Sequence, residues 1–311
     1  MNIALIESIA FSDIDWHSYD LIIFSSGFEE RSSHVVKYVP LAARRNTHVF
    51  GFPNQLSTLS RKSNDDIFQE VAGDNVFTTS SEGKYEEELC KRMIEAARGK
   101  SKLKILVDYS TMTRSWYGYI LTWSKYQNVC TSIEIDFAYS HGIYQHEFSP
   151  LQISEIACVP GFEGGGAGSR VTTALFGLGF DSAATLTVNE LIEPDRVVCF
   201  LARGGLSDPH ADKVLKENTE MMDNSRASIL ELPTHDIRRA TSLLLEKIST
   251  MDGESQEILL VPMGPKTHVL ACLLACHVSP KITCLHAKGT RIQPVQVSAA
   301  GPISVSRVIY R

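Results

Sequence analysis

The sequence predicts an α/β protein built from two tandem Rossmann-like parallel-sheet units arranged as a pseudo-dimer. Short apolar runs alternate with amphipathic segments along the whole chain. The runs are too apolar for half-exposed strands, which indicates parallel sheets that are covered on both faces. The same succession of runs occurs in both halves at a nearly constant spacing, which indicates a duplication. The length of 311 residues also fits two domains.

The individual elements follow from the period and length of the apolar runs. In the first half, the predicted strands are 21–24, 48–52, 76–79, 104–107 and 133–139, and the predicted helices lie near 32–44, 56–72, 84–98 and 115–127. In the second half, the predicted strands are 173–177, 196–201, 228–232, 258–261 and 281–286, and the predicted helices lie near 181–192, 210–223, 236–250 and 267–277. The stretch 303–310 alternates and predicts one more strand, antiparallel at a sheet edge.

Two turns also match between the halves. Gly27-Phe28-Glu29 and Gly179-Phe180-Asp181 each end a strand and open a helix, 152 residues apart. Ile105–Thr113 and Leu259–Thr267 are 154 residues apart. The alternative is two unrelated α/β domains of similar size. The duplication predicts a first unit at 1–142, a hairpin (143–148) and glycine-rich linker (161–168) within 143–171, and a second unit at 172–311.

Composition narrows the classes of function. The formal net charge is −6 and the isoelectric point about 5.9, so direct DNA or RNA binding is not expected. The first residues carry no secretion signal, and the longest apolar run, Val269–Cys276, is far shorter than the ~20 residues of a membrane span. Seven scattered cysteines indicate reduced thiols. The expected protein is cytoplasmic and has no membrane partner.

Candidate ligand-binding residues lie in the turns that follow four of the predicted strands. Ligands of open parallel sheets bind outside the carboxyl ends of the strands, where helix N-termini present free N–H groups. The four turns are 26–32, 108–115, 179–182 and 263–268. We expect them to meet at one cleft between the two units.

The first turn contains Ser26, Gly27, Glu30 and Arg31. Ser26 and Glu29 fit a capping box, in which each side chain bonds to the other residue's backbone, and this structural alternative stays open. Arg31 is a cation in a first helical turn, where the helix dipole disfavours it. It is therefore expected either to pair with Glu30 or to bind an anionic ligand.

The second turn contains Asp108, Ser110, Thr111, Thr113 and Arg114. Hydroxyl groups and an arginine at a helix start suit a phosphate, and a carboxylate that closes a buried strand suits a sugar hydroxyl. The alternative for a single hydroxyl is an ordinary helix N-cap.

The remaining two turns contribute glycines, an acid and a cation. Gly179 and Asp181 follow the first strand of the second unit. Gly264, Lys266 and Thr267 follow its fourth strand and place a cation where a phosphate would lie.

Neither a cofactor nor a metal is expected. Gly177-Leu-Gly179 resembles a truncated dinucleotide fingerprint, but Ser182 replaces the third glycine. His268, Cys272 and Cys276 share one helical face, as zinc ligands can. Their helix is nearly all apolar, however, which favours buried thiols.

At these turns the chain resembles CARF domains, the CRISPR-associated Rossmann-fold modules that sense nucleotide second messengers. Pro262–Ala271 resembles the turn at the start of a later helix, and Ser25–Arg31 is positioned like the early ligand loop. CARF domains usually dimerise so that two such edges bind one cyclic oligonucleotide. The resemblance implies that this chain supplies both edges itself. The chain shows no appended effector segment. A sensor of this kind therefore needs a separate effector protein as its partner, or a cleft that is itself catalytic.

Three functions remain in view. The first is a nucleotide-sensing or adaptor protein in prokaryotic antiviral defence, which binds a phosphate-bearing small molecule. The second is a nucleotide-processing enzyme, such as a glycosidase, hydrolase or transferase, that uses Asp108 with Glu29 or Glu30. The third is a non-catalytic scaffold for a partner effector protein. The fold alone does not separate these functions.

Overall fold

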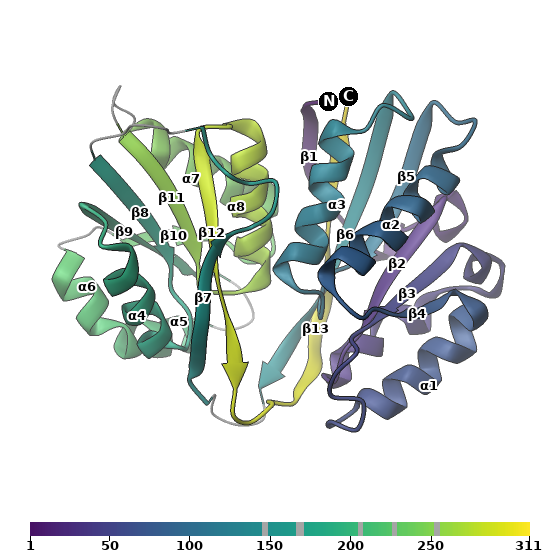
Figure 1. The fold of residues 1–311 in the computed structure, drawn as a ribbon, viewed down its shortest axis with the longest axis horizontal. Helices are drawn as coiled ribbons and strands as arrows, with labels where there is room; N and C mark the ends of the chain where they lie inside the picture. Colours follow the sequence, from purple (N-terminus) through teal and green to yellow (C-terminus); the bar gives the residue numbers. More distant parts are fainter. Residues whose placement is uncertain (145–148, 166–170, 205–207, 226–228, 252–255) are drawn as a thin grey trace. The chain divides into compact units, whose positions relative to one another are not determined.

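The chain folds into two sheets, each with helices between its strands (Figure 1). The computed structural model describes residues 1–144, 149–165, 171–204, 208–225, 229–251 and 256–311. One unit comprises Met1–Glu147 and Pro294–Arg311, and the other comprises Phe148–Gln293. Both sheets are mixed, and most of their strands are parallel. This confirms the predicted α/β class with two Rossmann-like units.

The first unit contains a seven-stranded sheet in the order β1-β13-β6-β5-β2-β3-β4. Its strands are β1 (Ile3–Ile9), β2 (Leu21–Ser26), β3 (Thr47–Gly51), β4 (Val76–Thr78), β5 (Lys102–Asp108), β6 (Ser132–Tyr144) and β13 (Val297–Tyr310). Its α-helices are α1 (Arg61–Ala72), α2 (Glu82–Ala97) and α3 (Arg114–Tyr126). Short 3-10 helices are η1 (Phe11–Asp13), η2 (Trp16–Ser18), η3 (Glu30–Ser33), η4 (Val35–Tyr38), η5 (Leu41–Asn46) and η6 (Gly73–Asn75). Strands β2 to β6 are parallel, whereas β13 is antiparallel to both β6 and β1.

The sheet of the first unit is covered on both faces. Phe68 of α1 packs with Phe24 of β2 and Val49 of β3 on one face. On the other face, Phe50 of β3 contacts Tyr85 of α2 and Trp116 of α3. Because both faces are buried, every residue of β2 is buried, as the continuous apolar run predicts.

The helix expected near 32–44 is wrong. The segment forms the separate 3-10 helices η3, η4 and η5. Proline disfavours the helical conformation in the residue before it, and Val39 before Pro40 is extended, with φ −71° and ψ 113°. The proline therefore accounts for the break between η4 and η5.

The second unit contains a six-stranded sheet in the order β10-β9-β8-β11-β12-β7. Its strands are β7 (Leu151–Cys158), β8 (Val171–Gly177), β9 (Arg196–Ala202), β10 (Ile229–Leu232), β11 (Gln256–Pro262) and β12 (Ile282–Arg291). Its helices are α4 (Ser182–Ile192), α5 (Asp208–Glu217), α6 (Thr219–Ser225), α7 (Ile237–Ser249) and α8 (Lys266–Val278). Val188, Val214 and Met221, from α4, α5 and α6, pack on one face, and His268 of α8 meets Phe200 on the other.

The two sheets share one strand order. In each, the five parallel strands, numbered along the chain, lie in the order 3-2-1-4-5, and an antiparallel strand follows the fifth. Strand β2 thus corresponds to β8, β5 to β11 and β6 to β12. The common order agrees with the duplication that the sequence spacing indicates.

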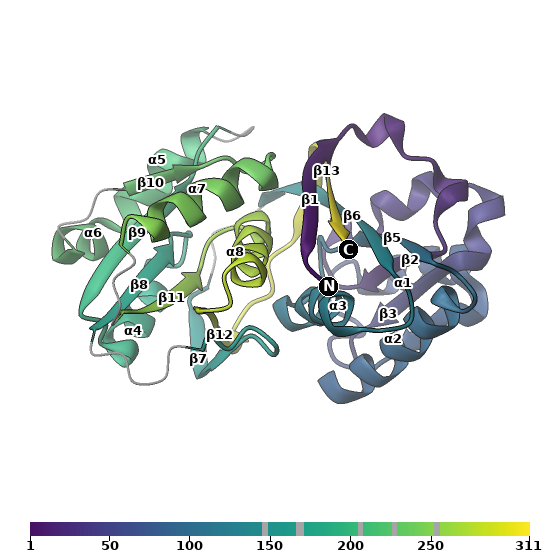
Figure 2. The same cartoon turned by 90° about the horizontal axis from the view of Figure 1, so that it is seen from above.

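The antiparallel strands are exchanged between the two sheets. Strand β7 directly follows β6 in the sequence but pairs with β12, and β13 directly follows β12 but pairs with β6. Figures 1 and 2 show β7 beside β12, and β13 between β1 and β6. The strand expected at 303–310 is therefore antiparallel as predicted. It lies inside the first sheet and not at an edge, because β1 pairs with its outer side.

Some predicted features fall outside the described residues. In the hairpin predicted at 143–148, the structure describes only the start, where β6 continues to Tyr144. The end of the glycine-rich linker, 166–168, is likewise not described. Among the described residues, no helix combines the length and the hydropathy that crossing a bilayer requires.

Candidate functional site

In each unit, the predicted turns lie where the strand order reverses. In the first unit, successive connections run from β2 to β3 on one side, and the chain then returns to β5 on the other side of β2. The carboxyl ends of β2 and β5 therefore border the crevice in which open α/β sheets bind ligands. In the second unit, β8 and β11 occupy the same positions. The four turns predicted to bind a ligand follow β2, β5, β8 and β11, as expected from the sequence.

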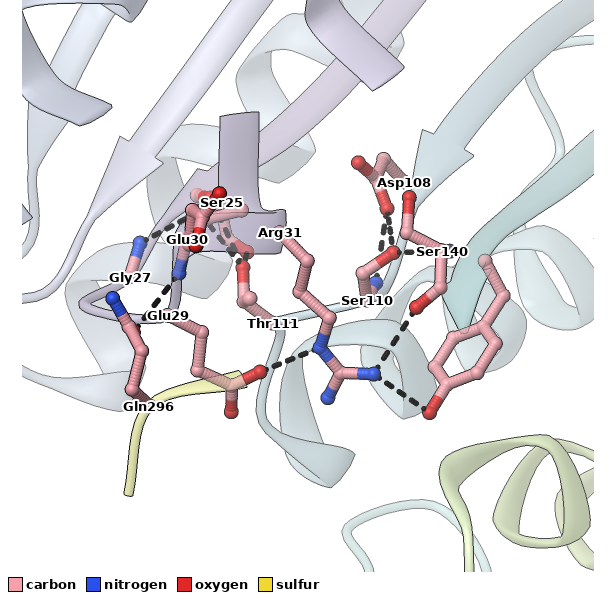
Figure 3. Close-up of polar contacts among 12 residues, drawn as sticks. Ser25, Gly27, Glu29, Glu30, Arg31, Asp108, Ser110, Thr111, Ser140 and Gln296 are labelled. Atoms are coloured by element: carbon pink, nitrogen blue, oxygen red, sulfur yellow. Dashed lines mark hydrogen bonds and ion pairs between the residues drawn. The ribbon is translucent and has the colours of Figure 1, made fainter. Parts of the chain in front are cut away.

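Hydroxyl groups from both turns meet at the edge of the first unit (Figure 3). The Ser25 and Thr111 hydroxyl oxygens are 2.8 Å apart, and Ser32 Oγ lies 3.2 Å from Thr111 Oγ1. Ser32 Oγ donates to the Ser25 carbonyl and accepts from Gly27 N. These contacts hold the turn after β2 against the turn after β5. Thr111 was a sequence candidate, whereas Ser25 and Ser32 were not.

Ser26 does not form the capping box. Its hydroxyl donates to Asp65 Oδ1 of α1 at 2.5 Å, and Glu29 makes no side-chain cap bond to η3. Asp65 also accepts from Arg61 Nε at 2.9 Å, and Arg61 is buried. The sequence does not reveal this support from α1, because charged residues at the start of a helix are typical of a solvated face.

Asn64 of α1 also holds the turn after β2. Its amide donates to the Gly27 and Glu29 carbonyls at 2.9 and 2.8 Å. Buried carbonyl oxygens need such donors, since an unpaired one costs about 1–3 kcal/mol. The helix α1 therefore positions the turn after β2, and no periodicity of the sequence could have indicated those long-range partners.

Arg31 is held inside the first unit. It is 3% exposed, and its Nε pairs with Glu29 Oε2 at 2.6 Å. Its Nη1 donates to the Tyr139 hydroxyl and to the Ser140 carbonyl of β6, both at 3.1 Å (Figure 3). The expected pairing with Glu30 is not the one observed. Arg31 ties η3 to β6, and its charge is balanced by Glu29.

Glu30 contacts the exchanged strand region. Its backbone N–H donates to Gln296 Oε1 at 3.2 Å, and its carboxylate accepts from Ser298 Oγ of β13 at 2.6 Å. The turn after β2 is thus bonded to residues near the end of the chain. Glu30 lies on the surface, beside β13.

Asp108 is bonded within its own turn. The carboxylate accepts from both the backbone N–H and the hydroxyl of Ser110, at 3.0 and 2.5 Å. Ser110 Oγ in turn accepts from Ser140 N at 2.8 Å. Asp108 is buried, so this arrangement joins the ends of β5 and β6.

The first turn of α3 has an N-cap, Thr113, and a cation, Arg114. Thr113 is the N-cap and accepts from Trp116 N at 3.3 Å, so the N-cap alternative holds for this hydroxyl. Arg114 is the first helical residue and half-buried. Its side chain makes no hydrogen bond or ion pair with any other residue that the structure describes. Its position against the helix dipole is unfavourable by about 0.3–1 kcal/mol, which a bound anion would reverse.

In the second unit, the two glycine turns pack backbone against backbone. A Cβ on Gly179 would lie 2.4 Å from the Met263 carbonyl oxygen, and one on Gly264 would lie 2.6 Å from the Leu178 carbonyl oxygen. Both positions therefore require glycine for close approach. This packing explains the glycines without a ligand, although it also leaves the turns after β8 and β11 side by side.

The Asp181 side chain has structural partners in α4, β7 and β12. It caps α4 by accepting from Ala184 N at 3.1 Å, and it accepts from Leu151 N of β7 at 2.8 Å. It also pairs with Arg291 at 2.9 Å. Asp181 thus anchors the exchanged strand β7, as Glu30 contacts β13 in the first unit.

Lys266 and Thr267 begin α8. Lys266 is the first residue of the helix, the position that Arg114 holds in α3, and it is half-buried. The Thr267 hydroxyl is buried and forms no hydrogen bond within the described residues. His268 follows, with its Nε2 donating to the Pro233 carbonyl at 3.2 Å. Burial lowers the pKa of His268 to about 4, which keeps the ring neutral at pH 7.

No group of three or more histidine, cysteine or carboxylate side chains is placed to hold a metal ion within the described residues. A comparison with models of protein families finds no match, and neither does a comparison with curated proteins. The expectation of one cleft shared by the units stays a prediction.

Proposed function

We propose that the protein is a nucleotide-sensing or adaptor protein. It binds a phosphate-bearing ligand at the carboxyl ends of the strands where the strand order of each unit reverses. We propose further that it acts in prokaryotic antiviral defence, in the cytoplasm, and passes its signal to a separate effector protein. The cytoplasmic setting is supported by seven cysteines that are all free. The defence role and the effector rest on the resemblance to CARF domains.

One observation carries the proposal. Each unit begins the helix after its fourth strand with a cation, Arg114 in α3 and Lys266 in α8. A cation in this position opposes the helix dipole, so it does not serve the stability of the helix. It does serve a phosphate, which a helix N-terminus and a nearby positive charge bind together.

Binding is better supported than catalysis. The three carboxylates proposed for an enzyme are all engaged within the first unit. Glu29 pairs with Arg31, Glu30 accepts from Ser298, and Asp108 accepts twice from Ser110. A general acid or base needs an oxygen in reach of the reacting group. These oxygens instead hold turns in place.

Thermal shift and calorimetric titration with a panel of mono-, di- and cyclic oligonucleotides test the proposal. A ligand at 100 times its Kd adds about 2.7 kcal/mol to the free energy of unfolding. We expect Arg114→Ala to remove or strongly weaken binding in the first unit, and Lys266→Ala to do so in the second. Arg98→Ala, at an exposed arginine after α2, is the control for net charge. The proposal fails if no nucleotide binds, or if both variants bind as the wild type does.

A further inference from the structure

An aromatic ladder ends at the same edge of the first unit. The rings of Tyr85 and Trp116 stack with centroids 4.1 Å apart and planes 5° apart. The ring of Phe52 stacks on Trp116 in turn, at 4.4 Å and 16°. Tyr85 and Trp116 are buried, whereas Phe52 is half-buried. Phe52 is therefore the outer ring of the ladder.

The outer ring lies beside the hydroxyl cluster. Phe52 directly follows β3, which is the neighbour of β2 in the sheet. A Cβ on Gly27 would lie 3.7 Å from the edge of the Phe52 ring and 3.2 Å from Thr111 Cβ. The turns after three adjacent strands, β3, β2 and β5, thus converge around Gly27. Trp116 lies in the first turn of α3, two residues after Arg114.

Hydrogen bonds from Arg61 hold the backbone at Phe52 in place. Arg61 Nη1 donates to the Phe52 and Asn54 carbonyls at 2.9 and 3.3 Å. The same guanidinium is held by Asp65, which also accepts from Ser26. A ring whose backbone is fixed in this way loses little entropy when a ligand stacks on it, and such preorganisation favours binding.

We propose that Phe52, backed by Trp116, is the platform for a planar ring of the ligand, namely a nucleobase. This proposal rests on the proposed function, because the phosphate of the same ligand lies at the start of α3. Base–aromatic stacking is strong and tolerates every base, since each base has a π-face. The ligand class is therefore a nucleotide with both base and phosphate, rather than an inorganic anion or a sugar phosphate.

Trp116 supplies a direct readout. In a Trp16→Phe, Trp123→Phe variant it is the remaining tryptophan, because the chain has three. We expect each of the four ribonucleoside triphosphates to change its fluorescence, and inorganic triphosphate to bind without that change. Phe52→Leu lowers the affinity for the nucleotides by about tenfold or more, and leaves the affinity for inorganic triphosphate unchanged. Phe52→Tyr retains nucleotide binding.

Phe11→Leu is the matched control, because Phe11 is a half-buried ring of the same unit that packs on Trp16 and Tyr38 instead. Circular dichroism checks that each variant is folded. If nucleotides and inorganic triphosphate bind equally well, and Phe52→Leu changes neither affinity, the stacking proposal is wrong and the proposed function survives. If neither kind of probe binds, both proposals fall.

Discussion

Arg307 forms a two-pronged ion pair with Asp136, which lies directly opposite it on the neighbouring strand. Arg307 Nε and Nη2 donate to the two carboxylate oxygens, each at 2.8 Å, and Asp136 is fully buried. The Tyr19 hydroxyl donates to the same carboxylate at 2.5 Å, and burial together with this carboxylate raises the pKa of Tyr19. The pair fastens the exchanged strand β13 to β6.

Breaking this pair will destabilise the protein strongly. Arg307→Met leaves the buried Asp136 charge without its cation, and we expect a loss of about 3 kcal/mol in the free energy of unfolding, measured with urea. The double variant Arg307→Met, Asp136→Leu should regain at least half of that loss, since the Asp136 charge is then gone and the buried Glu134, which Arg307 also contacts, still pairs with Lys102 and Lys104. Lys288→Met is the control. Lys288 lies opposite Glu155 on the other exchanged strand, in an exposed pair 3.4 Å long, and its loss costs less than about 1 kcal/mol. Equal costs for Arg307→Met and Lys288→Met would contradict the assignment.

The protein becomes less stable as the pH falls, because His268 is buried as a neutral ring. Burial lowers its folded pKa to about 4, below the ordinary 6.5, so the unfolded chain takes up the proton first. The contribution is fully present above pH 6.5 and is lost as the pH falls towards 4. Between pH 7.5 and pH 5 we expect His268 to contribute a loss of about 2 kcal/mol. His268→Gln removes this contribution, whereas His48, whose pKa burial also lowers to about 4, keeps its own. His17→Gln, at an exposed histidine, should keep the wild-type dependence. A wild-type curve retained by His268→Gln would show that other groups cause the effect.

Alanine at the packed glycine turns will cost stability. In Gly179→Ala or Gly264→Ala, the new methyl group meets a backbone carbonyl at less than 3 Å, and the turns must separate. We expect a loss of about 1–3 kcal/mol in each variant, measured by chemical unfolding. Gly83→Ala is the control, because open space surrounds Gly83 in the first turn of α2, and alanine is the better helix former. It should be neutral or stabilising, and a similar loss there would remove the packing argument.

The exchange of β7 and β13 predicts that a nicked chain stays together. A protease site inserted after Gly165 cuts the chain into one fragment with β1 to β7 and another with β8 to β13. Each fragment then contributes a strand to the other fragment's sheet. We expect the two to co-elute from a sizing column after cleavage and to separate only in denaturant. Separation under native conditions would show that β7 pairs with β6, and β13 with β12.

The sequence predicts the ten parallel strands well, because runs buried on both faces are continuously apolar. It misses β1, whose residues are half-buried or exposed and which is paired only by β13 at the far end of the chain. It also misses β7, which lies within the predicted linker 143–171 but is a strand of the second sheet. The sequence pattern does not assign partners to β7 and β13. Equivalent strands of a duplicated design fit either sheet, so local pattern leaves the choice undetermined.

The candidate site was predicted in outline. The turns lie at the expected edges, since topology alone fixes where parallel strands end. The roles within the turns were harder to predict. Arg31 and Asp108 form ion pairs or hydrogen bonds within the first unit. Arg61 and Asp65 support the turn after β2. Each role depends on partners distant in sequence, which composition and spacing do not reveal.

The place of β13 bears on biosynthesis. A ribosome that has made the first unit's other strands must still translate the entire second unit before the residues that complete the first sheet emerge. Until then, β6 has an open edge and β1 has no neighbour, because both pair with β13. Nascent chains therefore expose the unpaired edge of β6 for about half of translation, the condition in which proteins aggregate or need chaperones. A premature stop in the last 20 or so codons would thus damage the part of the protein that was synthesised first.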